Sequence, residues 1–205
     1  DAVFYALLQS QPQRFDQKGD LFYEQLSAFH KSVRGSSPDG ALYWMARFIT
    51  AGGDPRHLIR RLTAIASEDI GNADPRALEI TLNAWDAYER LGDAEGCRAI
   101  AHAAVYCASA PKSNAIELAY QAALAAVQGA PSYPVPEHLC NAPTALLKSL
   151  HKGTDYRYAH NEPHAYAAGQ TYLPPEMAGQ IFYHPTEYGL EQKIKARLEA
   201  LKALD

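Results

Sequence analysis

The spacing of apolar residues between Gly19 and about Val127 is the feature that most limits what this chain can fold into. In the first stretch they recur at steps of three and four residues, as on one face of an α-helix: Leu21, Phe22, Leu26, Phe29 and Val33. Gly35 follows and supplies a helix stop. Similar punctuation returns along the chain, so we expect a run of helices.

Capping residues mark where the next helices begin and end. Ser37-Pro38-Asp39 can start a helix that ends before Gly52-Gly53. Its predicted apolar face consists of Leu42, Met45, Ala46 and Ile49. Asp54-Pro55-Arg56 then places an N-cap acceptor ahead of a proline at the first helical position, where the missing N–H does no harm.

Asp74-Pro75-Arg76 repeats this device and starts a helix that Gly92 ends. The predicted apolar face of that helix consists of Leu78, Leu82, Trp85 and Tyr88. The two copies could mark a structural repeat, but the residues after them agree in little beyond Leu58 and Leu78. We therefore interpret Asp-Pro-Arg as a shared helix start.

Two alanine-rich helices are predicted from Asp93 to about Ser109 and from Ser113 to about Val127. Small side chains in the second allow neighbouring backbones to approach closely: Ala122, Ala123, Ala125 and Ala126. Helices joined by such short loops predict an all-α fold, a multi-helix antiparallel bundle.

From Ala130 to Pro185 the composition changes, because eight prolines break up any long helix, although residues 144–150 could form a short one. Tyrosines are spread through it, among them Tyr156, Tyr158, Tyr166, Tyr172 and Tyr183. We expect this proline- and tyrosine-rich irregular segment to wrap over the helical body, with its rings buried and its hydroxyls bonded. A final amphipathic helix is predicted from about Glu187, with one stripe of Leu190, Ile194, Leu198, Leu201 and Leu204.

The composition suits a globular protein with a sizeable core, since 47% of the 205 residues are hydrophobic and 20% are charged. A net charge of −4 does not favour a stand-alone nucleic-acid binder, although a local basic patch is compatible with it. Three cysteines show no paired-ligand spacing, and Cys97 and Cys107 are too far apart along one helix to bridge. We find no signal peptide and no apolar run that could span a bilayer, and so expect reduced thiols in a cytosolic protein.

Motifs for nucleotide hydrolysis or covalent catalysis are not recognisable. There is no Gly-x-x-x-x-Gly-Lys-Ser/Thr loop and no Gly-x-Gly-x-x-Gly turn after a strand. Lys152-Gly153-Thr154 has a similar order but lacks the glycine-rich lead-in. Nothing resembles a nucleophile elbow, and Cys107 is interpreted as a small core residue.

The densest group of candidate metal ligands is formed by His151, His160 and His164. His160 and His164 could share a helical face, as a zinc site requires. Pro163 lies between them and no third ligand has a fixed spacing, which favours loop histidines bonded to the backbone. A small metal-dependent hydrolase using these three histidines stays open as an alternative function.

Basic residues offer a better candidate for a binding site. Five of them are candidate contacts for DNA phosphates: Lys31, Arg34, Arg56, Arg60 and Arg61. Two close one predicted helix and three crowd the first turns of another, where Arg56 and Arg60 share a face. The alternative is that these side chains are solvated or pair with acids such as Glu68 and Asp69.

Seven strings of residues are more specific than any single motif. They are Lys31-Ser32-Val33-Arg34-Gly35-Ser36, Ala66-Ser67-Glu68-Asp69-Ile70-Gly71, Asn72-Ala73-Asp74-Pro75-Arg76-Ala77, Ala110-Pro111-Lys112-Ser113-Asn114-Ala115, Asn141-Ala142-Pro143-Thr144, Tyr156-Arg157-Tyr158-Ala159-His160 and Tyr166-Ala167-Ala168-Gly169-Gln170. In this order they resemble the replication-associated recombination protein A family, also called MgsA, whose eukaryotic relative is the Werner helicase-interacting ATPase. One departure is Cys140, which stands where the family commonly has arginine, so any DNA contact of that arginine is absent here.

The resemblance implies an N-terminal AAA+ ATPase portion, similar to clamp loaders, ahead of this chain. Residues 1–18 would be the end of its helical lid and a linker. Residues 19–205 would be the C-terminal helical domain through which family members form homotetramers, much as a clamp-loader collar holds its subunits. The resemblance also implies DNA-stimulated ATP hydrolysis at stalled replication forks and association with single-stranded-DNA-binding protein. ATP and Mg²⁺ would bind in the ATPase portion, with no cofactor in these residues.

The predicted function is therefore a non-catalytic tetramerisation domain of an AAA+ ATPase that acts in DNA replication, recombination and repair in the bacterial cytoplasm. Candidate oligomer contacts are the alanine-rich helices and the stripe of the last helix: Leu190, Ile194, Leu198 and Leu201. Besides the hydrolase, an independent helical adaptor that binds peptides in a groove stays open.

Overall fold

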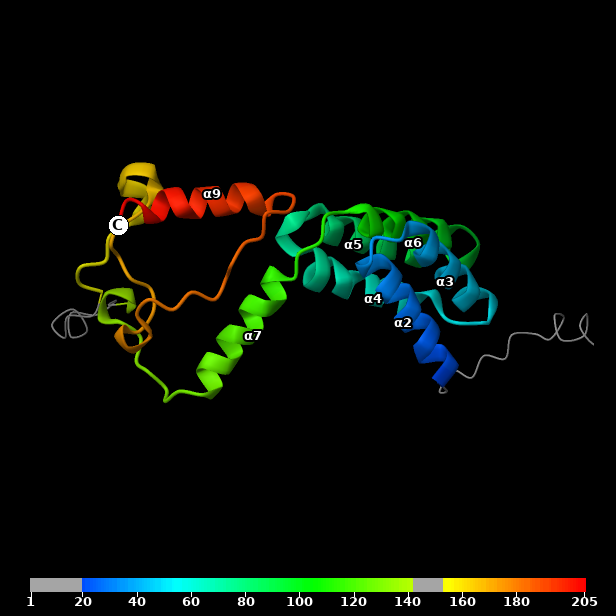
Figure 1. Ribbon diagram of the computed structural model, residues 1–205, viewed down its shortest axis with the longest axis horizontal. Coiled ribbons are helices and arrows are strands. Elements are labelled where there is room, and N and C mark those ends of the chain that lie inside the picture. Colours follow the sequence, from blue (N-terminus) through cyan, green and yellow to red (C-terminus); the bar gives the residue numbers. More distant parts are fainter. Residues whose placement is uncertain (1–19, 142–152) are drawn as a thin grey trace, which may run out of the picture. The chain divides into compact units, whose positions relative to one another are not determined.

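The computed structural model describes residues 20–141 and 153–205, and their regular structure is helical (Figure 1). Seven α-helices lie in these two ranges: α2 (Asp20–Arg34), α3 (Pro38–Thr50), α4 (Pro55–Ile65), α5 (Arg76–Leu91), α6 (Asp93–Ser109), α7 (Ala115–Gln128) and α9 (Glu191–Lys202). The same ranges contain no β-strand, which confirms the all-α prediction for them. None of the described helices is long and apolar enough to cross a membrane.

The described residues form two compact units. The first holds those up to Glu117 together with Tyr188–Leu190, and the second holds those from Leu118 to Glu187 and from Glu191 onward. The predicted boundary between residues 18 and 19 and the short helix predicted at residues 144–150 lie outside the described ranges. Both stay predictions.

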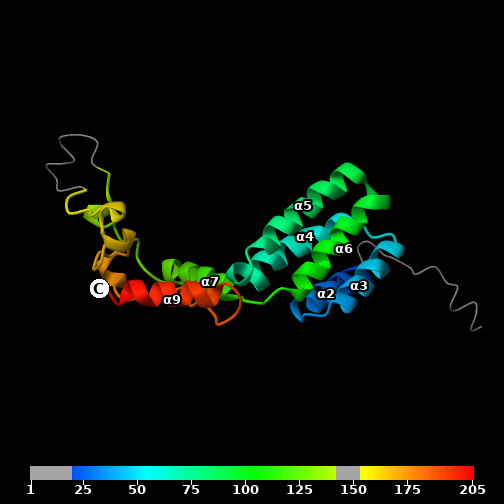
Figure 2. The same ribbon diagram turned by 90° about the horizontal axis from the view of Figure 1, so that it is seen from above.

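Helix α6 is the centre of the first unit, because α2, α3, α4 and α5 all pack against it (Figure 2). The buried residues of α6 are mostly small: Gly96, Ile100, Ala103, Ala104, Cys107 and Ala108. Side chains of this size let the neighbouring helices approach one axis closely. Those helices supply the larger, fully buried core residues, which include Phe29, Val33, Phe48, Leu58, Ile59, Leu62 and Ile65.

The predicted caps of α3 and α4 are confirmed. Ser37 Oγ accepts a hydrogen bond from the Gly40 N–H at 3.2 Å, and Asp54 Oδ1 accepts one from the Arg56 N–H at 2.9 Å. Asp74 also accepts a bond from the backbone N–H two residues on, at 3.3 Å, but α5 begins only after Pro75. The repeated Asp-Pro-Arg is thus a helix start in both places, with the second helix beginning one residue later.

Three predicted helix faces are wrong in part. In α2 the predicted residues Phe22, Leu26, Phe29 and Val33 are buried, but Leu21 is 50% exposed. In α3 the buried residues are Ala41, Met45 and Phe48, while Leu42 is exposed. In α5 the buried residues are Ala77, Thr81, Ala84 and Tyr88, while Leu78 and Leu82 are exposed. Apolar periodicity favours large side chains, whereas several of the core contacts of α3 and α5 are made by small ones.

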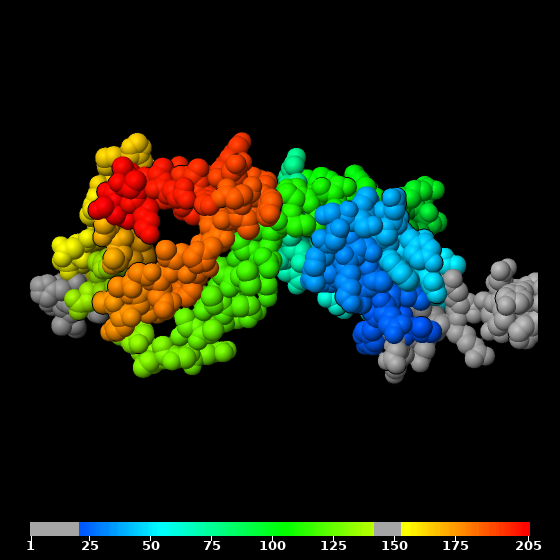
Figure 3. Space-filling model, viewed as in Figure 1, coloured from blue at the N-terminus to red at the C-terminus, as the bar shows by residue number. Residues whose placement is uncertain are grey.

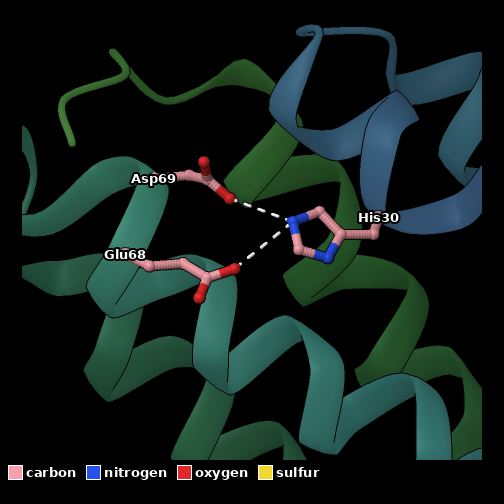
Figure 4. A group of neighbouring side chains, drawn as sticks. All are labelled: His30, Glu68 and Asp69. Atoms are coloured by element: carbon pink, nitrogen blue, oxygen red, sulfur yellow. Dashed lines mark hydrogen bonds and ion pairs between the residues drawn. The ribbon is translucent and has the colours of Figure 1, made fainter. Parts of the chain in front are cut away.

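After α4 the chain continues as a π-helical turn, Ala66–Ile70, and then a 3₁₀ turn, Gly71–Ala73. The backbone carbonyl of Asp69 accepts a hydrogen bond from the Ser113 N–H at 2.8 Å, so the π-helical turn is tied to the segment after α6. This turn carries Glu68 and Asp69 toward α2 (Figure 4).

The second unit buries few side chains. Among its described residues, Ala167 and Glu191 are buried. The Glu191 carboxylate accepts hydrogen bonds from the Tyr183 hydroxyl at 2.9 Å and from the Thr186 N–H and hydroxyl at 2.9 and 2.7 Å. Three donors compensate the cost of burying this charge and hold the start of α9.

The described part of the proline-rich segment forms only short 3₁₀ turns, as an irregular segment should. Its tyrosines follow the prediction only in part. Tyr166 and Tyr183 are half-buried, and their hydroxyls donate to Asp205 and Glu191. The prediction of buried rings is wrong for three of the five tyrosines named in the sequence analysis, which are about half exposed: Tyr156, Tyr158 and Tyr172.

Helix α9 is shorter than predicted, because it begins at Glu191 rather than near Glu187. Leu190 therefore precedes the helix, and its N–H donates to the Ala73 carbonyl at 2.9 Å within the first unit. It does not share a helical stripe with Ile194, Leu198 and Leu201.

The α5–α6 contact can be tested at Gly96, where an added Cβ would lie 2.7 Å from the Tyr88 Cα. We expect Gly96→Ala to lower the free energy of unfolding by about 1–3 kcal/mol, although alanine favours a helix over glycine by about 1 kcal/mol. Asn83→Ala, on the exposed side of α5, should change it by less than about 0.5 kcal/mol. Urea denaturation measures both, and a Gly96→Ala variant as stable as the wild type would contradict this contact.

Candidate functional site

A cluster of charged and polar side chains joins α2 to the π-helical turn (Figure 4). The Nε2 atom of His30 lies 3.1 Å from Asp69 Oδ2 and 3.4 Å from Glu68 Oε1. Arg34 donates from Nε to Asp69 Oδ1 at 2.6 Å and places Nη2 2.7 Å from the same His30 nitrogen. Only about a tenth of the His30 and Asp69 side chains is exposed, so water screens these contacts weakly.

Burial decides the charge of His30. Removal from water lowers the pKa of this imidazole below its usual value, and the charges of Arg34 and Arg61 lower it further. The hydrogen bond to Asp69 and the charge of Asp69 raise the pKa, but by less. The imidazole is therefore uncharged at neutral pH. The hydrogen bond to Asp69 raises the pKa of Arg34, which keeps its charge.

Arg56 takes part in a separate ion pair. Its guanidinium donates to both carboxylate oxygens of Glu89, at 2.8 and 3.1 Å, and its Cζ lies 5.3 Å from the centroid of the Tyr88 ring. The bond to Glu89 raises the pKa of Arg56. For Arg34 and Arg56 the structure thus shows intramolecular pairing, which was the alternative to a DNA contact.

Lys31, Arg60 and Arg61 differ from these two. All three are exposed, and over residues 20–141 and 153–205 they have no ion pair. Helix α4 packs against α2, and the charge of Arg61 is the smallest of the causes that act on the pKa of His30. Of the five basic residues singled out in the sequence, these three keep an uncommitted charge at the surface.

Of the three histidines considered as metal ligands, the described ranges include His160 and His164. His160 and His164 are exposed and lie in separate 3₁₀ turns, Ala159–Asn161 and Pro163–Ala165, rather than on one helical face. Neither has two further ligand groups within metal-binding distance among the described residues. His151 lies outside the described ranges.

Helix α7 leaves its apolar residues in contact with water. Of its fourteen residues only Ala115 is buried. Tyr120 is 60% exposed and Val127 is 73% exposed, and both fall on one side of the helix with Leu124. Leu118, on another side, is 59% exposed.

Helix α9 presents apolar residues to a groove in the second unit. The groove has a volume of about 670 Å³ and is lined in part by Leu198, Leu201, Ile181 and Tyr183. Figure 3 shows an opening between α9 and the segment that precedes it. Leu198 remains 43% exposed and Ile194 is half-buried, so the predicted stripe is only partly covered.

The sequence analysis names Arg34, Glu68 and Asp69 and allows them to pair, as Arg34 and Asp69 do, but it does not single out His30. His30 and Asp69 are 39 residues apart, and no local spacing relates them. One of the strings that carry the family resemblance contains Glu68 and Asp69, and another begins at Lys31, directly after His30. These strings could have drawn attention to the pair.

The lowered pKa of His30 predicts how stability depends on pH. The unfolded chain takes up the proton at a higher pH than the folded chain, so stability is fully present above about pH 6.5 and falls as the pH drops below it. Replacing His30 with glutamine should make the free energy of unfolding depend less on pH below about pH 6.5. Urea denaturation at pH 5 to 8 with a chelator present measures the effect, and His102→Gln, at an exposed site on α6, should keep the wild-type dependence.

Comparison with known proteins places these observations in a family. Residues 35–202 match the family model described as "MgsA AAA+ ATPase C terminal". The chain is 59% identical over 192 residues to replication-associated recombination protein A of Escherichia coli strain K12, and 57% identical over 192 residues to the protein of that name from Haemophilus influenzae. It is 39% identical over 178 residues to ATPase WRNIP1 of Dictyostelium discoideum.

The matches to the two bacterial proteins cover 94% of this chain but 43% of each relative, so the chain spans less than half of their length. The match to the Dictyostelium protein covers 87% of this chain and 20% of that relative. The family model spans most of the chain, and the two bacterial relatives are identical to this chain at more than half of the aligned positions. The chain therefore belongs to the MgsA AAA+ ATPase C-terminal family.

Proposed function

We propose that this domain holds together the subunits of a replication-associated AAA+ ATPase as a homotetramer. The observation that carries the proposal is the exposed apolar surface of α7. Support also comes from the names of the relatives, which are recombination proteins associated with replication. The domain itself would carry no catalysis, and ATP and Mg²⁺ would bind in an ATPase portion.

The chemistry of α7 is unusual for a solvated helix. Its sequence, AIELAYQAALAAVQ, has a single charged residue, Glu117. Helices that face water on most sides normally carry charged residues there. Burying apolar surface contributes about 25 cal/mol per Å², so covering Tyr120, Leu124 and Val127 with another copy would add stability.

Helix α9 is the second candidate contact. Leu198 and Leu201 line the groove of the second unit, and Ile194 lies one turn earlier on the same helix. Leu190 is exposed but precedes α9 and belongs to the first unit. A subunit contact at Leu190 would therefore be separate from a subunit contact at α9. A closed tetramer would use each such surface once in every subunit, as a clamp-loader collar would.

The assembly can be tested by placing charges on α7. Light scattering should give four times the mass of one chain for the wild type, and a lower mass for Tyr120→Glu combined with Val127→Glu, because two carboxylates would be buried without partners. The control is Leu78→Glu combined with Leu82→Glu, at exposed leucines of α5, which should remain tetrameric. A strictly monomeric wild type would favour a peptide-binding adaptor, and a tetramer unaffected by the α7 changes would place the interface elsewhere.

A second role, contact with DNA, is favoured by the uncommitted charges of Lys31, Arg60 and Arg61. Each lysine or arginine that neutralises a phosphate releases counterions, which makes the affinity depend on salt. Arg34 and Arg56 would contribute less, because Asp69 and Glu89 already neutralise them.

In the full-length protein, Arg60→Glu combined with Arg61→Glu should weaken DNA binding and reduce the slope of log affinity against log salt by about two. DNA-stimulated ATP hydrolysis should fall in parallel, while the tetramer stays intact. Arg90→Glu combined with Arg98→Glu, two exposed arginines of α5 and α6, imposes the same change in net charge. Equal losses in both variants would show a general charge effect and remove the case for a contact at α4.

A further inference from the structure

We propose that His30, Glu68 and Asp69 form a binding site for a divalent transition-metal cation. One ligand atom from each residue, Nε2 of His30 and a carboxylate oxygen of each acid, lies within 4.8 Å of the other two. The separations from Nε2 are 3.1 Å to Asp69 Oδ2 and 3.4 Å to Glu68 Oε1. Atoms bound to one metal at about 2.1 Å, at tetrahedral or octahedral angles, lie about 3.0–3.5 Å apart, so these two distances match a shared cation.

Hydrogen bonding alone does not satisfy this arrangement. The Nε2 atom of His30 donates a hydrogen bond when it carries a proton and accepts one when it does not, so it cannot do both. A donor, Arg34 Nη2, approaches it at 2.7 Å, and the carboxylate oxygens of Asp69 and Glu68 approach it as acceptors. If Nε2 carries a proton, that proton faces the N–H donor of Arg34; if it does not, its lone pair faces the carboxylate oxygens. A cation between the three residues would instead accept a lone pair from each of them.

Arg34 acts as the internal competitor of this cation. Its guanidinium contacts both His30 and Asp69, so it supplies a positive charge where the metal would bind. About half of the Arg34 side chain is exposed, so it can turn into water without opening the core. Metal binding would then release Arg34 from Asp69 and add its charge to the surface of α2.

The framework around the ligands is already in place. Glu68 and Asp69 are consecutive in the π-helical turn, and the Ser113 N–H holds the backbone of Asp69 from the other side. Glu68 is one-third exposed, which leaves room for water to complete the coordination. One imidazole with two carboxylates suits Zn²⁺, Mn²⁺ or Fe²⁺, while Ca²⁺ and Mg²⁺ favour all-oxygen sites.

The test uses Co²⁺ as a visible probe and Zn²⁺ for calorimetry, with the chain first treated with a chelator. We expect one Co²⁺ per chain, with absorption bands that Zn²⁺ abolishes. Arg34→Gln should bind at least several-fold more tightly, because the competing charge is gone. Glu68→Gln, at a partly exposed position that the fold tolerates more easily than His30→Gln, should weaken binding about tenfold or more.

Two results would overturn the site. One is the absence of Co²⁺ bands from both the wild type and Arg34→Gln at millimolar metal. The other is an unchanged signal in Glu68→Gln and in folded His30→Gln, which would assign the metal to other histidines. His102→Gln serves as the control, since it removes an exposed histidine of α6 and should leave the Co²⁺ affinity unchanged. Tetramer mass is measured on the same samples, so that failure of assembly and failure of metal binding are distinguished.

Discussion

The first unit depends on how closely its helices approach α6. Four helices pack against this one, and its buried positions carry little larger than alanine or cysteine apart from Ile100. Gly96 marks a very close contact, where one added carbon would reach the backbone of Tyr88. Because the surrounding helices converge on a single axis, His30 of α2 and Asp69 of the π-helical turn meet within hydrogen-bonding distance.

The sequence predicts the ends of these helices better than their buried faces. Ser37 and Asp54 cap helices through bonds to backbone N–H groups two or three residues on, so the information is local. The buried face depends on the neighbouring helix. Leu82 is more apolar than Thr81, yet Leu82 is exposed and Thr81 is buried on the closely packed side of α5. The Thr81 hydroxyl donates a hydrogen bond to the Leu78 carbonyl at 2.9 Å, which makes its burial possible.

The charged residues show the same limit for the candidate sites. The sequence offers Asp69 as one possible partner of these basic residues, and Arg34 does pair with it. The partner of Arg56, Glu89, is not recognisable from local spacing, because it lies 33 residues further along the chain. Helix packing alone decides these pairs. Arg60 and Arg61 can be named from the sequence, but the structure is needed to show that they form no ion pair within the described ranges, whereas Arg34 and Arg56 do.

The two units bury apolar surface to different degrees, and this difference separates ligand binding in the first unit from assembly through the second. The first unit closes a core of its own, and the His30 cluster lies at the edge of that core. In the second, the best buried group is the Glu191 carboxylate, while Val127 of α7 and Leu198 of α9 face water. The three hydrogen bonds to Glu191 fix the backbone at the start of α9 but bury no apolar surface. Binding at the cluster would therefore respond to changes of charge, whereas assembly through the second unit would respond to apolar area, and each can vary without the other.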